Sequence, residues 1–151
     1  MAATMLSFRD DALSDADFAV IHGFLSQTYW AAGIPADTLR RALDGSLCYR
    51  GYLDGELVAF ARAVTDQATF AYLADVFVVA RQRGRGYGRA VVEALMADPR
   101  VQGLRRWLLV TSDMQPLYAK LGFTALPRPE QHMHKHDPDV YLRAREAAPA
   151  P

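Results

Sequence analysis

The residues best suited to chemistry lie between Phe70 and Asp98, where an apolar run leads into a loop rich in arginine and glycine. Glycines at positions 84, 86 and 88 are separated by arginine and tyrosine, and an amphipathic helical pattern follows them. Glycine lets backbone amides converge on one point, and a helix N-terminus adds the positive end of its dipole. Neighbouring arginines add charged donors. This pattern favours a site for a phosphorylated small molecule.

Two common nucleotide-binding motifs do not fit this loop. The dinucleotide motif G-x-G-x-x-G requires glycine where Arg89 stands, and a P-loop requires a Gly-Lys-Ser/Thr sequence that the loop lacks. Two interpretations therefore stay open at this point. The loop either holds a phosphate through its backbone amides, or it is a sharp turn from strand to helix with solvated arginines.

Composition limits the class of protein. The 151 residues are 51% hydrophobic and 23% charged, which is typical of one globular domain, and we expect it to span residues 1–142. The formal net charge is zero, so no overall field favours nucleic acid or an anionic membrane as a partner. Apolar runs are too short to span a bilayer, which predicts a cytoplasmic protein. Residues 143–151 are predicted to form a frayed tail.

The N-terminal part predicts a short strand at residues 5–9 and two helices. Ser14 is a suitable N-cap for a helix that runs to about Gln27. A second helix is predicted over residues 35–44, ended by Gly45 in a left-handed conformation. Between the helices, Tyr29 and Trp30 lie in a loop. These aromatic side chains could plug the edge of the core or form the wall of a substrate cleft.

The middle of the chain predicts a three-stranded meander. Residues 47–53 and 56–64 flank Asp54-Gly55, which is typical of a type I′ hairpin turn. Residues 70–79 are apolar on both faces, which indicates a central strand. After the helix that follows the glycine loop, residues 107–110 predict another interior strand, parallel to the third strand of the meander.

The C-terminal part predicts a short helix over residues 113–121, with Asp113 as its N-cap. Gly122 would end this helix, with Phe123 making the apolar contact that accompanies such an end. A short edge strand would follow. The element order predicts an α/β fold with a mixed sheet.

Two motifs together resemble the GNAT superfamily of N-acetyltransferases. The segment from Phe77 to Gly88 is similar to the acetyl-CoA signature Q/R-x-x-G-x-G/A, with Arg81 in the first place and Gly84 and Gly86 in the glycine places. A second family element, L-Y-x-K-x-G-F, stands at residues 117–123. The motifs occur in family order, and the resemblance covers nearly the whole chain.

The resemblance implies that acetyl-CoA binds between two parallel strands that splay apart. The backbone of one strand would pair with the pantetheine arm as if it were an added strand. Amides of the loop would hold the pyrophosphate, and exposed arginines could meet the ribose phosphate. The implied coenzyme-binding residues are Phe77, Val78, Val79, Arg83, Gly84, Arg85, Gly86, Tyr87, Gly88 and Arg89.

Acetyl transfer to an amine requires a base, a donor to the oxyanion and an acid for the departing thiolate. The resemblance implies that Tyr118 is the acid, since a phenol stays protonated at neutral pH; otherwise its ring packs the seam. The oxyanion donor would be the amide of Phe77 or Val78. Asp75 is the only charge in an apolar strand, so it is either the base or a structural carboxylate paired with Arg62.

Several points stay open from the sequence. Many relatives have an asparagine near the start of the helix that carries the tyrosine, whereas this chain has Thr111-Ser112-Asp113. His132, His134 and His136 alternate, which suits either a solvated edge strand or a transition metal, although nothing in the family requires a metal.

The predicted function is transfer of acetyl from acetyl-CoA to a primary amine of a small molecule or peptide. The alternatives are a non-catalytic acyl-CoA-binding module, which could be regulatory, and a regulator that binds another nucleotide. An edge strand near the C-terminus could support a homodimer.

Overall fold

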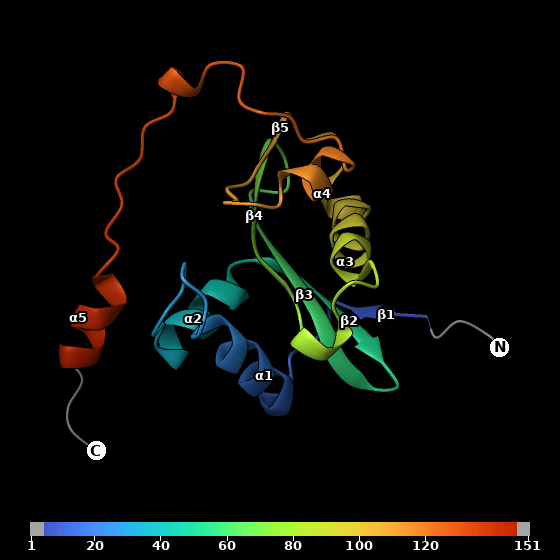
Figure 1. Cartoon of the computed structure of the whole chain (residues 1–151), viewed down its shortest axis with the longest axis vertical. Coiled ribbons are helices and arrows are strands. Elements are labelled where there is room, and N and C mark those ends of the chain that lie inside the picture. Colours follow the sequence, from blue (N-terminus) through green and yellow to red (C-terminus); the bar gives the residue numbers. More distant parts are fainter. Residues whose placement is uncertain (1–4, 148–151) are drawn as a thin grey trace.

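A five-stranded mixed sheet organises the chain, and the computed structural model describes residues 5–147 (Figure 1). Neighbouring strands are antiparallel except β4 and β5, which are parallel. This confirms the predicted α/β fold with a mixed, mostly antiparallel sheet. In spatial order the strands are β1 (Ser7–Arg9), β2 (Leu47–Leu53), β3 (Glu56–Thr65), β4 (Phe70–Val78) and β5 (Arg106–Leu108).

Five α-helices accompany the sheet in the described part of the chain. None of them has the length and apolar character that a bilayer crossing requires. Short 3-10 turns occur at residues 80–82, 99–101 and 129–131. The α-helices are α1 (Asp15–Leu25), α2 (Ala36–Asp44), α3 (Tyr87–Met96), α4 (Gln115–Ala119) and α5 (Val140–Ala147).

The sheet separates two apolar clusters, because side chains on a strand alternate between its faces. One cluster joins α1 and α2 to the sheet, with Ile21, Leu39 and Phe60 fully buried. The other joins α3 to the opposite face, with Val91 and Leu95 fully buried. Each face of the central strands is therefore covered by helices, as the apolar character of residues 70–79 predicted.

Local signals in the sequence set several boundaries correctly. The Ser14 side chain accepts a hydrogen bond from the Asp17 amide at 3.1 Å and caps α1. Asp54 and Gly55 both have positive φ, 49° and 82°, as a type I′ turn requires. Gly122 has φ 94°, and the Phe123 amide donates to the Tyr118 carbonyl at 3.1 Å, which is the predicted helix end.

Other predictions of local structure were wrong. Gly45 has φ −88°, so α2 ends without a left-handed residue. Met114 rather than Asp113 is the N-cap of α4, and Thr111 accepts the Met114 amide. The end of α2 therefore needs no left-handed glycine, and the start of α4 is capped by a threonine hydroxyl rather than by the Asp113 side chain.

The C-terminal region also differs from the sequence prediction. Strand β5 lies at the edge of the described sheet rather than inside it. The short edge strand expected after α4 does not form, since residues 132–136 pair with no strand in the described part of the chain. Residues 143–147, expected in a frayed tail, belong to helix α5; residues 148–151 lie outside the described part.

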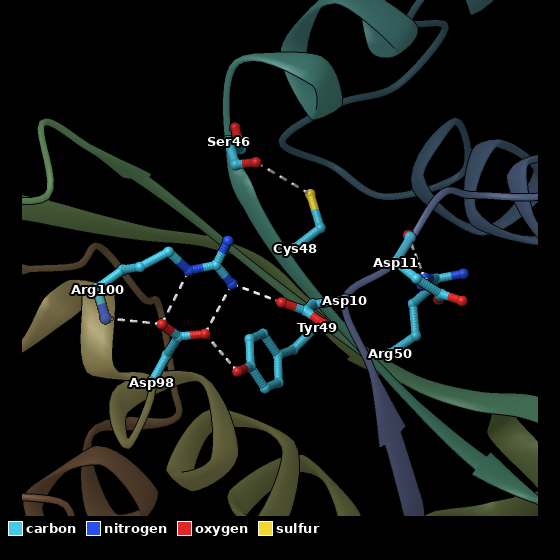
Figure 2. Close-up of polar contacts among 8 residues, drawn as sticks. All are labelled: Asp10, Asp11, Ser46, Cys48, Tyr49, Arg50, Asp98 and Arg100. Atoms are coloured by element: carbon cyan, nitrogen blue, oxygen red, sulfur yellow. Dashed lines mark hydrogen bonds and ion pairs between the residues drawn. The ribbon is translucent and has the colours of Figure 1, made fainter.

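A polar cluster ties the end of α3 to the sheet at β2 (Figure 2). The Asp98 carboxylate, with 5% of its side chain exposed, accepts hydrogen bonds from the Tyr49 hydroxyl at 2.5 Å and from the Arg100 guanidinium at 2.7 and 2.9 Å. Arg100 also pairs with Asp10 in the segment after β1. The Arg100 hydrogen bonds, followed by that from Tyr49, hold the pKa of Asp98 well below its usual range, and burial opposes them.

Replacing Asp98 with Ala should therefore lower the free energy of unfolding by about 2–3 kcal/mol near pH 7, because Tyr49 and Arg100 lose a charged acceptor. The carboxyl pKa is lower in the folded state, so its contribution is present above the unfolded pKa of about 4 and is lost as pH falls below it. Urea unfolding at several pH values measures both effects. The control is Glu93→Gln, which removes an exposed pair with Arg89 and should change stability by no more than about 0.5 kcal/mol.

Candidate functional site

The parallel strands β4 and β5 pair over a short length and then separate. Phe70, Ala71 and Tyr72 pair with residues 106–108, whereas β4 continues to Val78 beside β3 alone. One edge of β4 is therefore unpaired along residues 73–78 in the described structure. An unpaired edge exposes backbone donors and acceptors to which an extended ligand can bind.

The Val78 peptide faces this open edge. The Val79 amide donates to the Val58 carbonyl of β3 at 2.9 Å, and antiparallel pairing alternates, so the groups of Val78 turn away from β3. The Val78 carbonyl instead accepts from the Arg83 guanidinium at 3.3 Å. Of the three strand residues predicted to face the coenzyme, Val78 is thus the one whose backbone N–H and C=O are not used by β3.

Phe77 and Val79 have other contacts. The Phe77 ring is buried and stacks on Phe24 of α1, with ring centroids 4.1 Å apart. The Val79 amide is already used by β3. The Phe77 ring thus supports the strand from the side of α1, and the Val79 amide is not free to bind a ligand.

The glycine loop adopts a backbone that only glycine takes without strain. Gly84 and Gly86 have φ of 79° and 81°, in the left-handed region. Gly86 is the N-cap of α3 and has no side chain to offer, and the first intrahelical bond runs from the Ala90 amide to the Gly86 carbonyl at 3.0 Å. The amides of residues 87–89 therefore have no acceptor within the helix and point out of its N-terminus. This arrangement suits an anion such as a pyrophosphate.

The side chains around the loop leave its centre accessible. Arg85 is exposed, and Tyr87 is half-buried against the cluster under α3. Arg89 pairs with Glu93 at 2.7 Å on the exposed surface, where such a pair contributes little and can exchange for a phosphate. A Cβ on Gly88 would meet the Val78 side chain at 3.5 Å, so glycine here lets α3 approach the strand closely.

Asp75 lies at a bulge in β4. Phe60 pairs with Phe77 but Arg62 pairs with Ala74, so β4 carries one more residue than β3 between these two pairs. Asp75 itself has φ 55°, a conformation that few non-glycine residues adopt.

Two donors from different elements hold the Asp75 carboxylate. Its Oδ2 accepts from the Arg62 Nε at 2.8 Å, and its Oδ1 accepts from the Trp30 Nε1 at 2.8 Å. The side chain is 8% exposed. Arg62 also donates to the Ser46 hydroxyl at 3.1 Å, which fixes the guanidinium at its other end. The pairing with Arg62 that the sequence offered as one alternative for Asp75 is therefore present.

The loop between α1 and α2 reaches both separated strands. Trp30 contacts Asp75 in β4, and the Tyr29 hydroxyl donates to Ser112 beyond β5 at 3.2 Å. The two rings meet edge to face at 5.0 Å, and the residues are 75% and 46% exposed. Neither ring belongs to the described apolar clusters, so they do not plug the core edge; that they wall a substrate cleft stays a prediction.

Tyr118 is 9% exposed on α4, and its ring meets Phe123 edge to face at 5.9 Å. Burial raises the pKa of its hydroxyl, so the phenol is protonated throughout the neutral range. The residue also lines a groove of about 1080 Å³ beside β5. Its ring both packs and borders a cavity, so its two predicted roles are compatible.

Sequence reasoning missed two polar residues that position the others. Ser46 anchors Arg62, and Ser112 anchors Tyr29. A serine gives no signal of such a role in the sequence, because its partner lies far along the chain. The pairing of Arg62 with Asp75 had a signal, since Asp75 is the single charge in its strand and Arg62 is the single charge of its strand beyond the first residue, Glu56.

Comparisons with known proteins agree with this geometry. Residues 9–123 match the family model described as the acetyltransferase (GNAT) family. A crystal structure of a presumed GNAT-family acetyltransferase from Xanthomonas campestris is 47% identical, with a TM-score of 0.84, and the match covers 91% of this chain and 96% of that one.

Two curated relatives are also similar. A presumed acetyltransferase from Gibberella zeae is 34% identical over 74% of this chain and 73% of its own length. Serotonin N-acetyltransferase 2, a chloroplastic protein from Oryza sativa subsp. japonica, is 35% identical over 70% of this chain and 57% of its own length.

The left-handed backbone at Gly86 leads to a prediction for coenzyme binding. Replacing Gly86 with Ala adds a Cβ with no heavy atom within 4 Å, so the cost of about 1–2 kcal/mol comes from the positive φ alone. If the loop shifts away from this φ, acetyl-CoA binding should weaken at least tenfold, because a loss of about 1.4 kcal/mol in binding free energy lowers the affinity tenfold. Calorimetry measures this change.

The matched control is Gly23→Ala, in helix α1, where a Cβ also meets nothing and φ is not positive. This variant should bind acetyl-CoA as the wild-type protein does. Equal affinity in the Gly86 variant would contradict a role for the loop conformation.

Proposed function

Because the chain belongs to the acetyltransferase (GNAT) family, whose members use acetyl-CoA, we propose that it transfers the acetyl group to a primary amine by direct attack in a ternary complex. The observation that carries the proposal is the continuity of two features. The open edge of β4 ends at Val78, and the uncapped N-terminus of α3 lies one short loop further along the chain. An extended arm joined to a pyrophosphate has the same two parts in the same order.

Val78 and the start of α3 would bind the coenzyme. The Val78 peptide offers one donor and one acceptor to the pantetheine amides, and Arg83 would release the Val78 carbonyl to do so. The amides of residues 87–89 and the helix dipole would hold the pyrophosphate, with Arg85 close by in the loop.

On the same open edge of β4, a backbone amide would stabilise the negative charge that develops on the thioester oxygen during attack. The amine nitrogen forms the new C–N bond while the C–S bond breaks. Tyr118 would give its proton to the departing thiolate, and burial keeps that proton in place at neutral pH.

The Asp75 carboxylate is held by two donors, so its proposed role is narrower than that of an unrestrained general base. Two guanidinium nitrogens of Arg62 lie 2.8 Å from Oδ2 and Trp30 donates to Oδ1, and the Arg62 charge balances that of the carboxylate. A balanced carboxylate can still accept one hydrogen bond from an ammonium and orient it, with water carrying the proton away. We therefore place Asp75 in acceptor binding, with proton removal by Asp75 itself as the alternative that kinetics separates.

The acceptor would be a small alkylamine or an exposed peptide amine. Tyr29 and Trp30 present two exposed rings beside the carboxylate, and an ammonium is attracted both to aromatic faces and to a carboxylate. The rice relative named for serotonin acetylation acts on an amine of this kind, an aromatic ring joined to a short alkylammonium.

The experiment that tests the function measures release of the coenzyme thiol with a panel of alkylamines and peptides, for the wild-type protein and Tyr118→Phe. The wild-type protein should turn over at least one amine, and the variant should lose about 10²-fold in kcat while binding acetyl-CoA equally. With an activated thioester, whose departing thiolate needs no proton, the difference in rate between the wild-type protein and the variant should be smaller. Tight coenzyme binding without turnover of any amine would support a non-catalytic acyl-CoA-binding module instead.

Replacing Asp75 with Asn separates its two roles. If the carboxylate orients the acceptor, KM for the amine should rise about tenfold or more while kcat changes little, because an amide cannot attract an ammonium. If it is the base, kcat should fall while KM for the amine changes little. Glu56→Gln is the control, since Glu56 is exposed and, among residues 5–147, forms an ion pair with Arg81 alone, and it should leave both constants unchanged.

A further inference from the structure

A cavity of about 470 Å³ is bounded by the segment after β1, helices α1 and α2, and strands β2 and β3. Its apolar lining includes Leu13, Phe18, Leu43, Leu47 and Phe60. The residues proposed above to bind acetyl-CoA or the acceptor are not among those that line it. A volume of this size with an apolar lining and a few polar groups is typical of a small-molecule site.

Arginines and aspartates also line this cavity, and two pairs of them are already closed within the protein. The buried Arg50 donates to the Asp11 carboxylate at 2.6 Å, and Arg100 donates to the Asp10 carboxylate at 2.5 Å (Figure 2). The charges of these four residues are therefore balanced by one another. One arginine and one aspartate of the lining remain.

The remaining two charged residues, Arg40 and Asp44, lie one turn apart on α2. Side chains four residues apart lie on the same face of a helix, with Cβ atoms about 5–6 Å from each other. Arg40 and Asp44 carry opposite charges but do not pair, and Asp44 forms no ion pair with any residue from 5 to 147. The cavity therefore presents one positive and one negative group at a short, fixed spacing.

Both groups are available to a ligand. The Arg40 guanidinium lies 3.9 Å above the centroid of the Phe18 ring, which is part of the cavity wall. Its partner is Asp15 at 3.0 Å, and since both side chains are exposed, this pair contributes little and can exchange for another carboxylate. Asp44 is the last residue of α2, where the helix dipole also favours a cation.

We propose that this cavity binds a free α-amino acid with an apolar side chain. Such a molecule carries a carboxylate and an ammonium on one carbon atom, as the spacing on α2 requires. The carboxylate binds Arg40 and the ammonium binds Asp44 through charge-assisted hydrogen bonds. The side chain enters the apolar lining beside Leu43 and Phe60. A simple carboxylate or a simple amine leaves one of the two charges without a partner.

This site is separate from the one that contains Asp75. Ser46 lies between them, because it lines the cavity and also accepts a hydrogen bond at 3.1 Å from Arg62, the partner of Asp75. An amino acid is itself a primary amine, so a test must distinguish binding in the cavity from binding as an acceptor.

Calorimetry of the full chain with L-leucine, L-methionine and L-phenylalanine tests the proposal, and at least one of them should bind. For L-leucine, the comparison molecules are isocaproate, isoamylamine and glycine, which lack the ammonium, the carboxylate and the side chain respectively. Each should bind at least about tenfold more weakly, as should L-leucine to Arg40→Gln and to Asp44→Asn, because each change removes one hydrogen-bonded charge or the apolar contact.

The matched control variants are Arg41→Gln and Asp37→Asn, which each remove one exposed charge from α2 outside the cavity. They should bind the amino acid as the wild-type protein does, and so should Asp75→Asn. The single cysteine of the chain, Cys48, reports the location, because it lines the cavity. A bound amino acid should therefore slow the reaction of Cys48 with methyl methanethiosulfonate.

Three results would overturn the proposal. None of the three amino acids binds; or isocaproate or isoamylamine binds as tightly as L-leucine; or Asp75→Asn weakens binding while Arg40→Gln and Asp44→Asn do not, which identifies the amino acid as an acceptor. The release of coenzyme thiol tests acetyl transfer separately, so failure here leaves the proposed function as it stands.

Discussion

The hydrogen-bonded pair of Arg62 and Asp75 is the interaction on which the arrangement of the site depends. A carboxylate at positive φ inside a strand is costly unless its surroundings hold it there. Arg62 supplies a charged partner on the neighbouring strand, and Ser46 holds the far end of the guanidinium. The bulge this stabilises changes the register of β4 against β3 just after the strand has left β5 behind.

The stretch of β4 beyond the bulge is supported from both faces. Phe77 is stacked against α1 on one side, and the Val78 side chain packs against Gly88 of α3 on the other. Rigid support of this kind keeps an unpaired edge straight when no strand accompanies it. The glycine loop then follows directly, so the position of the α3 N-terminus relative to the edge is fixed by packing rather than by a flexible linker.

Much of the fold could be predicted from the sequence because its signals are local. Ser14, Asp54-Gly55 and Gly122 act within a few residues, and alternation of apolar side chains identified the central strands. The left-handed glycines of the loop before α3 could be recognised for the same reason, and the binding of coenzyme there stays a prediction. The position of β5 at the sheet edge could not be predicted, because whether residues 132–136 pair with it depends on where α5 packs, at Tyr141 and Gly33. The anchoring roles of Ser46 and Ser112 likewise depend on contacts between distant segments.

The loop between α1 and α2 has a consequence for how the protein can change. Its two aromatic residues span the separated strands and belong to a segment that shares no residue with the glycine loop or the open edge of β4. Insertions or substitutions at Tyr29 and Trp30 alter the space above the strands while the backbone that faces the coenzyme stays as it is. Under the proposed function, acceptor preference would therefore diverge through one short surface loop, and a library confined to that loop would be the direct route to a new acceptor.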